Sequence, residues 1–99
     1  MEKPAEDDTI SAWPYQVELS PYVRDVDSLK SYQVGFFSLD GEILGWSEEF
    51  SEPVFSFTGE MRGGGNLTDD AAWRAYVHFD QDGYSFSVTS GPTRVYYRP

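Results

Sequence analysis

YQVGFFSLDGEILGWS, residues 32–47, decides the fold, because two long β-prone runs flank a strong turn signal. Asp40-Gly41 is a favoured pair for a two-residue type I′ turn between antiparallel strands. In the register that this turn sets, Trp46 lies over Gly35. Both faces of the hairpin are partly apolar, so we expect it in the middle of a sheet rather than at an edge.

The same register makes two further predictions. Phe37 faces Leu44, and Phe36 faces Gly45. Both glycines of the hairpin strands, Gly35 and Gly45, therefore have a bulky residue across from them. An aromatic ring can cover the backbone that a glycine leaves bare. We therefore expect the two glycines to be packing positions.

A second hairpin is predicted where Asp80–Gly83 separates two alternating runs. With four residues in the loop, Val77 faces Phe86 on the apolar face. His78 then lies on the polar face, across from Ser85. A slip of one residue would turn the apolar side chains toward solvent, so the alternation determines which residues share a face.

The rest of the chain adds shorter elements. Alternating runs predict strands at residues 13–19, 53–58 and 93–97. Thr68 is a favoured N-cap with two aspartates after it, so the sequence allows at most one short helix, at residues 68–74. The sum is a mainly β fold, an antiparallel sheet of six or seven strands folded as a sandwich or as a strongly bent, barrel-like sheet. A sheet with a helix packed on one face is the alternative.

The chain has 99 residues, enough for one domain with a modest core. We expect residues 1–9 to be a disordered acidic tail, residues 10–99 to be a single antiparallel β domain, and residues 22–30 to be a connection within it. The sequence has no cysteine, no secretion signal and no apolar run that could span a membrane. These features predict a cytoplasmic protein.

The net charge of −10 lies entirely in residues 1–60. This part carries thirteen Asp and Glu against three Lys and Arg, whereas residues 61–99 carry four acids and four arginines. The resulting field opposes direct binding to nucleic acid or to an anionic membrane, and it favours a basic partner.

Motifs for catalysis or metal binding are weak. His78 is the sole histidine, and no carboxylate is in position to orient it in a triad. The run Asp80–Gly83 matches a fragment of a calcium loop, but turn chemistry explains it better. The glycines at 63–65 lack the lysine and hydroxyl residue of a phosphate-binding loop. We therefore predict a non-enzymatic protein without a metal site or a cofactor.

The acidic residues have two interpretations, a solvated surface that keeps the protein soluble or a surface that binds a partner. Spaced carboxylates on a rigid sheet can imitate a row of phosphates and occupy a basic groove meant for nucleic acid. Trp46 or Tyr22 would add an apolar anchor. The predicted partner-binding residues are Asp25, Asp27, Glu42, Trp46, Glu48, Glu49 and Glu52.

These features predict a small acidic inhibitor of a basic, nucleic-acid-handling protein, of the anti-CRISPR or anti-restriction type carried by phages and mobile elements. One alternative is an immunity protein that neutralises a basic toxin nuclease, and a structural subunit of a larger assembly is another. A carbohydrate-binding β module is the third, because Trp13, Trp46, Tyr76 and Tyr96 would present flat rings from a sheet.

Overall fold

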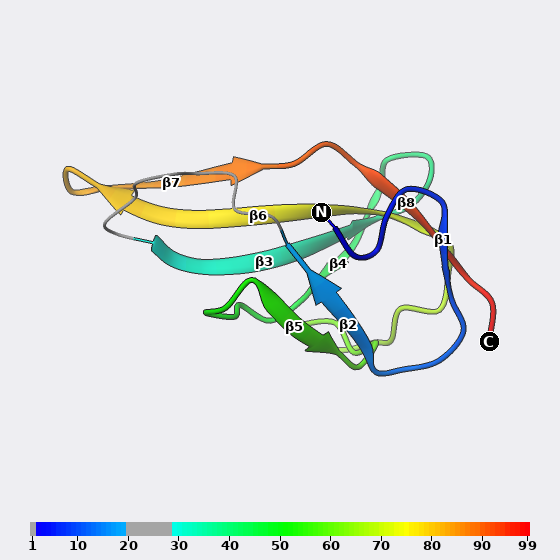
Figure 1. Cartoon of the computed structure of the whole chain (residues 1–99). Helices are drawn as coiled ribbons and strands as arrows, with labels where there is room; N and C mark the ends of the chain where they lie inside the picture. Colours follow the sequence, from blue (N-terminus) through cyan, green and yellow to red (C-terminus); the bar gives the residue numbers. More distant parts are fainter. Residues whose placement is uncertain (1, 20–28) are drawn as a thin grey trace.

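The computed structural model describes residues 2–19 and 29–99, which form eight strands and no helix (Figure 1). The strands are β1 (Asp8–Ile10), β2 (Tyr15–Glu18), β3 (Leu29–Phe37), β4 (Ile43–Trp46), β5 (Val54–Phe57), β6 (Ala71–Gln81), β7 (Tyr84–Thr89) and β8 (Thr93–Tyr97). The mainly β class is confirmed. The strand that the sequence did not predict is β1.

Two sheets make up the structure. The larger sheet has the order β1-β8-β6-β3-β4, with β7 also paired to β6, and the smaller sheet consists of β2 and β5. Every pair of strands is antiparallel except β1 and β8, which are parallel. The larger sheet is therefore mixed, and the prediction of a purely antiparallel sheet was wrong. Because β1 and β8 come from opposite ends of the chain, no hairpin constrains their relative direction.

Residues 2–10 pair with both sheets, where the sequence predicts a disordered tail over residues 1–9. Lys3 forms a β-bridge with Glu18 of β2, and β1 pairs with β8. Pro4 is fully buried. The Nε–H group of Arg94 in β8 donates to Glu6 at 2.8 Å. These contacts use backbone, proline and charged groups, so the polar composition of the segment gave no sign of them.

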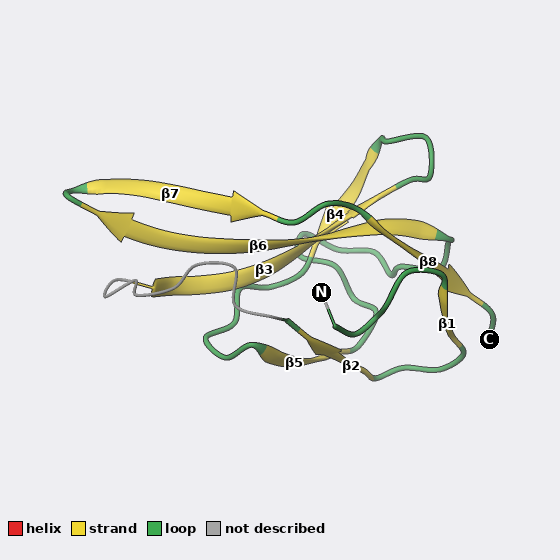
Figure 2. Ribbon diagram, turned by 45° about the horizontal axis from the view of Figure 1, so that its top comes forward, coloured by secondary structure: helices red, strands yellow, loops and turns green. Residues whose placement is uncertain are grey.

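The smaller sheet covers one face of the larger sheet, and the core lies between the two (Figure 2). Phe57 of β5 stacks on Phe36 of β3, with ring centroids 4.9 Å apart. Trp73 of β6 meets both rings edge-on, and all three side chains are fully buried. Burial of such a side chain stabilises the fold by about 1.5–3 kcal/mol. The two packed layers fit the sandwich alternative rather than the barrel.

The β3–β4 hairpin has the predicted pairs Gly35–Trp46 and Phe36–Gly45. β3 lies inside the larger sheet, but β4 forms an edge among the described strands, which corrects the expectation of a central hairpin. The expected covering of Gly45 by an aromatic ring was also wrong. A Cβ atom at Gly45 would lie 2.5 Å from the sulfur of Met61, so a thioether side chain covers this glycine.

The turn of this hairpin differs from the predicted two-residue type I′ turn. Residues 39–41 form a three-residue loop, closed by Gly41 with a left-handed φ of +96°. Phe37 consequently pairs with Ile43. Leu44, its predicted partner, is the extra residue of a β-bulge, which restores the predicted register beyond it.

The β6–β7 hairpin contains the two-residue turn instead of the predicted four-residue loop. Asp82 and Gly83 have φ values of +52° and +81°, and positive φ at both central residues is the mark of a type I′ turn. Each residue of β6 pairs with a residue of β7 two positions beyond its predicted partner, so that His78 lies opposite Ser87 rather than Ser85. A shift of two residues leaves every side chain on its predicted face.

The short helix that the sequence allowed at residues 68–74 does not form. β6 begins at Ala71, and its side chains alternate between buried and half-buried positions as far as Phe79. Burying Trp73 and the alternate residues after it outweighs the weak capping signal of Thr68.

Candidate functional site

The structure describes five of the seven predicted partner-binding residues. They lie in β4, in the loop before it and in the segment after it: Glu42, Trp46, Glu48, Glu49 and Glu52. The other two, Asp25 and Asp27, lie outside the described residues, as does the alternative anchor Tyr22.

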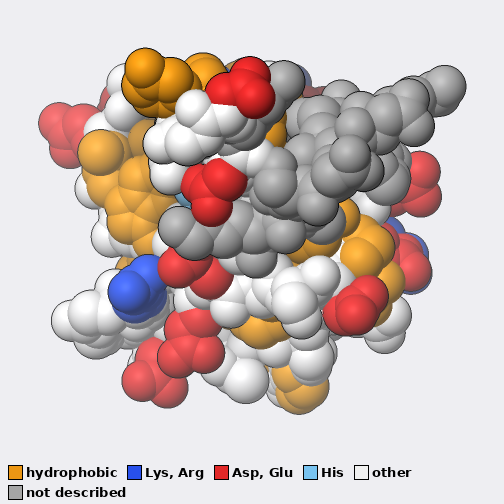
Figure 3. Space-filling view, turned by 90° about the vertical axis from the view of Figure 1, so that its left-hand side faces the viewer, with side chains coloured by type: hydrophobic (Ala, Val, Ile, Leu, Met, Phe, Trp, Pro, Cys, Tyr) orange, Lys and Arg blue, Asp and Glu red, His pale blue; other side chains and the backbone are white. Residues whose placement is uncertain are grey.

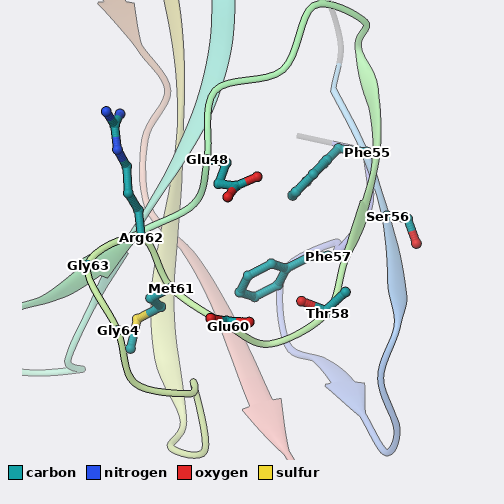
Figure 4. A pocket seen from close by; sticks show the side chains of 10 residues that line it. All are labelled: Glu48, Phe55, Ser56, Phe57, Thr58, Glu60, Met61, Arg62, Gly63 and Gly64. Atoms are coloured by element: carbon teal, nitrogen blue, oxygen red, sulfur yellow. The ribbon is translucent and has the colours of Figure 1, made fainter.

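An open cavity of about 370 Å³ lies beside Glu48 (Figure 4). Phe55 and Phe57 of β5 form one wall, and Glu60 lies at its lower edge in this view. Figure 4 shows the carboxylate of Glu48 pointing into the cavity toward Phe55, whereas the side chain of Arg62 points away from it. The cavity therefore combines two carboxylates with an aromatic wall. We call it the acidic cavity.

A tight turn at residues 61–65 closes the opposite side of the acidic cavity. The N–H of Met61 donates to the carbonyl of Gly65 at 2.9 Å, and the N–H of Gly64 donates to the carbonyl of Met61 at 3.1 Å. Gly63, Gly64 and Gly65 all have left-handed φ values, +90°, +106° and +86°. Side chains with a Cβ rarely adopt this conformation, so the turn requires its glycines. It is this turn that leaves Glu60 beside the aromatic wall.

Glu48 and Glu49 are adjacent in sequence but have different environments. Glu48 lines the acidic cavity. Glu49 accepts a hydrogen bond of 2.7 Å from the hydroxyl of Ser31, and its other oxygen lies 3.7 Å from Arg62. The two carboxylates therefore do not act as a pair.

The remaining predicted acids lie elsewhere, and one cavity acid was not predicted. Glu42 and Glu52 are exposed and do not line the acidic cavity. Glu60 was missed because its place depends on the turn that follows it. The three adjacent glycines indicated a turn, but they did not indicate which strand it would lie against.

Trp46 lies in a separate groove on the face of the larger sheet that the smaller sheet does not cover. A Cβ atom at Gly35 would be 2.9 Å from Trp46 Cζ3 and 2.9 Å from Tyr76 Cε2. The predicted covering of Gly35 by the indole ring is therefore confirmed. Arg62 lines both this groove and the acidic cavity. We call this uncovered face of the larger sheet the outer face.

His78 is hydrogen-bonded on the outer face. Its Nδ1 lies 2.6 Å from Ser87 Oγ, and its Nε2 lies 3.0 Å from Gln33 Oε1. Because Gln33 donates through Nε2 to the carbonyl of Ser47, its Oε1 is an acceptor and His78 carries a proton on Nε2. An amide oxygen orients the imidazole here. It lacks the negative charge that stabilises an imidazolium ion in a catalytic triad.

Two ion pairs near the C-terminal end of the chain perturb carboxyl groups away from these sites. Hydrogen bonds from Arg94 hold the pKa of Glu6 below its usual value. Hydrogen bonds from the Arg98 side chain and from the Tyr97 backbone do the same for the pKa of Asp70. Both pairs attach a chain end to the larger sheet.

Comparison with known proteins gave no relative, since no family model, curated protein or solved structure matches the chain. Across residues 2–19 and 29–99, no helix is long and apolar enough to cross a membrane. The same residues contain no group of three or more His, Cys, Asp or Glu side chains placed to hold a metal ion. Inferences about function therefore depend on the chemistry of the two surfaces described above.

Proposed function

We propose that the protein is a small, acidic, non-enzymatic inhibitor that binds a basic surface of a cytoplasmic, nucleic-acid-handling protein, of the anti-CRISPR or anti-restriction type. The observation that supports this function is the acidic cavity. Glu48 and Glu60 lie at a wall formed by Phe55 and Phe57, with about 370 Å³ of open space beside them.

The acidic cavity suits an arginine or lysine side chain of a partner. A guanidinium group stacks favourably on an aromatic ring, and Phe55 is half-buried with part of its surface open to the cavity. A carboxylate at the edge of the ring accepts hydrogen bonds from the same group, and such charged bonds are stronger than neutral ones. Glu48 and Glu60 form no ion pair with the described residues, so their charge is free to meet a cation from outside.

The charge of the whole chain adds long-range attraction. The net charge is −10, and acidic side chains are spread over the face seen in Figure 3. Glu42 and Glu52 are exposed outside the acidic cavity and would contribute to this field. Complementary fields raise the association rate and select partners by sign, whereas close contacts determine how long a complex lasts.

The test begins with affinity capture from a lysate of the native host at low salt, followed by elution with salt and mass spectrometry. We expect a basic nuclease or another nucleic-acid-binding protein. The captured protein is then titrated with two variants that each remove two negative charges. One is Glu48→Gln/Glu60→Gln in the acidic cavity, and the other, Asp69→Asn/Asp82→Asn, is the matched control.

The cavity variant should weaken binding about tenfold or more, equal to at least about 1.4 kcal/mol, while the control should change it by about twofold at most. Both variants should keep the thermal stability of the wild type, because the four substituted side chains are exposed. Equal losses in the two variants would assign the interaction to the general field and refute the role of the cavity. Absence of any basic, nucleic-acid-handling protein from the eluate would refute the proposed function.

A further inference from the structure

The outer face of the larger sheet carries a row of rings drawn from three strands. The ring centroids of Phe37 and Trp46 are 6.1 Å apart, those of Trp46 and Tyr76 are 4.9 Å apart, and those of Tyr76 and His78 are 6.4 Å apart. All four side chains are half-buried. A row of partly exposed rings is not needed for the core, which lies on the opposite face of this sheet.

Two open grooves follow this row and meet at Tyr76. The first has a volume of about 540 Å³ and lies along Trp46, Tyr76 and His78, with Arg62 at its border. The second has a volume of about 470 Å³ and lies along Phe37 and Tyr76. Each volume falls within the range of small-molecule sites, and together the grooves suit an elongated ligand rather than a compact one.

The side chains of the first groove are already held in place. Trp46 and Tyr76 both lie against the bare backbone of Gly35. The ring of His78 is fixed by hydrogen bonds on both sides, to Ser87 and to Gln33. A site that is ordered before its ligand arrives loses little conformational entropy on binding.

The charges around the grooves favour a neutral ligand over a polyanion. Arg62 lies within 3.7 Å of Glu49, and Arg94 lies within 2.8 Å of Glu6, so both cations are compensated. Arg74 lies over the ring of Phe37, 5.8 Å from its centroid. Few phosphates could be neutralised here, and tight binding of nucleic acid needs several such contacts.

We propose that the outer face binds a neutral oligosaccharide. The apolar C–H face of one sugar ring would stack on Trp46 and Tyr76, and the next ring would extend along the second groove toward Phe37. The guanidinium groups of Arg62 and Arg74 are the donors for sugar hydroxyls. The indole N–H of Trp46 and the hydroxyl of Tyr76 are two further donors, because neither is hydrogen-bonded to the described residues.

The experiment uses the full chain, labelled with ¹⁵N, and four probes: cellohexaose, mannohexaose, chitohexaose and maltohexaose, each to about 5 mM. We expect at least one probe to shift the indole N–H signal of Trp46 and the amides of residues 74–78, while β2 and β5 stay unchanged. Raising NaCl from about 50 mM to about 500 mM should change the affinity less than about twofold, because no net charge is neutralised.

Two variants test the assignment of the groove. Trp46→Ala should weaken binding about tenfold, whereas Tyr84→Ala, which removes a ring that is 69% exposed on β7 and lies outside both grooves, should leave it unchanged. Glu48→Gln/Glu60→Gln should also leave it unchanged, which keeps this test separate from that of the acidic cavity.

Three outcomes would overturn the proposal. The first is the absence of any shift with all four probes. The second is a set of shifts that maps to the smaller sheet. The third is salt-sensitive binding of an oligothymidylate to the outer face with higher affinity than any saccharide, which would make it a surface for single-stranded nucleic acid.

Discussion

Replacing Gly35 by alanine tests whether the outer face is as tightly packed as its geometry indicates. The added Cβ would lie 2.9 Å from a carbon of Trp46 and 2.9 Å from a carbon of Tyr76. Carbon atoms in contact prefer a separation of about 3.5–4.0 Å, so at least one ring must move by several tenths of an ångström. Neither ring moves freely, because the two pack against each other and Trp46 also meets Phe37.

The expected cost follows from two opposing effects. Overpacking of this kind destabilises a protein by about 1–3 kcal/mol. Replacing glycine by alanine within a strand returns about 0.5–1 kcal/mol, because the unfolded chain loses conformational freedom. The net expectation for Gly35→Ala is a loss of about 1–2 kcal/mol, or a fall in Tm of roughly 5–15 °C for a domain of this size.

Urea denaturation and calorimetry measure this loss, and Gly91→Ala is the matched control. A Cβ atom at Gly91 meets nothing within 4 Å, and its φ is not left-handed, so this variant should equal or exceed the wild type in stability. In a Trp46→Ala background, Gly35→Ala should cost less, since one of the two obstructing rings is gone. If Gly35→Ala and Gly91→Ala were equally stable, the close contact at Gly35 and the argument for a preformed groove would both be refuted.

Three further variants address the core, the chain ends and a turn. Phe57→Ala should lower the free energy of unfolding by about 3–5 kcal/mol and reduce the near-ultraviolet circular dichroism. A loss of less than about 1 kcal/mol would contradict the place of Phe57 in the core. The hydrogen bonds that lower the pKa of Glu6 and Asp70 stabilise the fold at neutral pH. This contribution is lost as the pH falls below the ordinary pKa values of the two groups, 4.5 and 3.8, and through their lower values in the folded state. The reason is that the unfolded chain binds more protons than the folded chain in this pH range. In Glu6→Gln/Asp70→Asn, the decline of Tm between about pH 5 and about pH 2.5 should be shallower, and an unchanged slope would contradict the assignment. Gly83→Ala should lower the free energy of unfolding, measured by chemical denaturation, by about 1–2 kcal/mol, because the φ of Gly83 is +81°. Gly83→Asn should lower it by less. Equal losses in the two variants would argue against a left-handed residue at this position.

Local alternation was sufficient to predict most of the strands. β2, β5 and β8 fall within the runs 13–19, 53–58 and 93–97, because apolar side chains every second residue leave one choice of buried face. The face of the sheet on which each side chain lies was predicted better than the length of each hairpin loop. Both hairpins contain an Asp-Gly pair, and the pair alone did not determine which of them would form the two-residue turn.

Features that depend on contacts distant in sequence were not predictable. The start of β6 resembles a capped helix locally, and the core position of Trp73 makes it a strand. The outer face was predicted in part, since the first hairpin alone placed Trp46 over Gly35. Tyr76 comes from the second hairpin, and its place beside Trp46 required the pairing of β3 with β6. Likewise, the place of Glu60 in the acidic cavity depends on the turn that follows it, and the sequence did not indicate which strand this turn would lie against.

The distribution of charge in the folded protein explains why salt should separate the two proposed sites. Arg62 and Arg94 come from the neutral part of the chain, and each pairs with an acid from the acidic part. Such pairing makes the outer face nearly neutral but leaves Glu48 and Glu60 uncompensated by the described residues. Raising NaCl from about 50 mM to about 500 mM shortens the screening length from roughly 14 Å to roughly 4 Å. Binding at the acidic cavity should then weaken steeply while binding on the outer face persists, so titrations at the two salt concentrations assign each binding event to its surface.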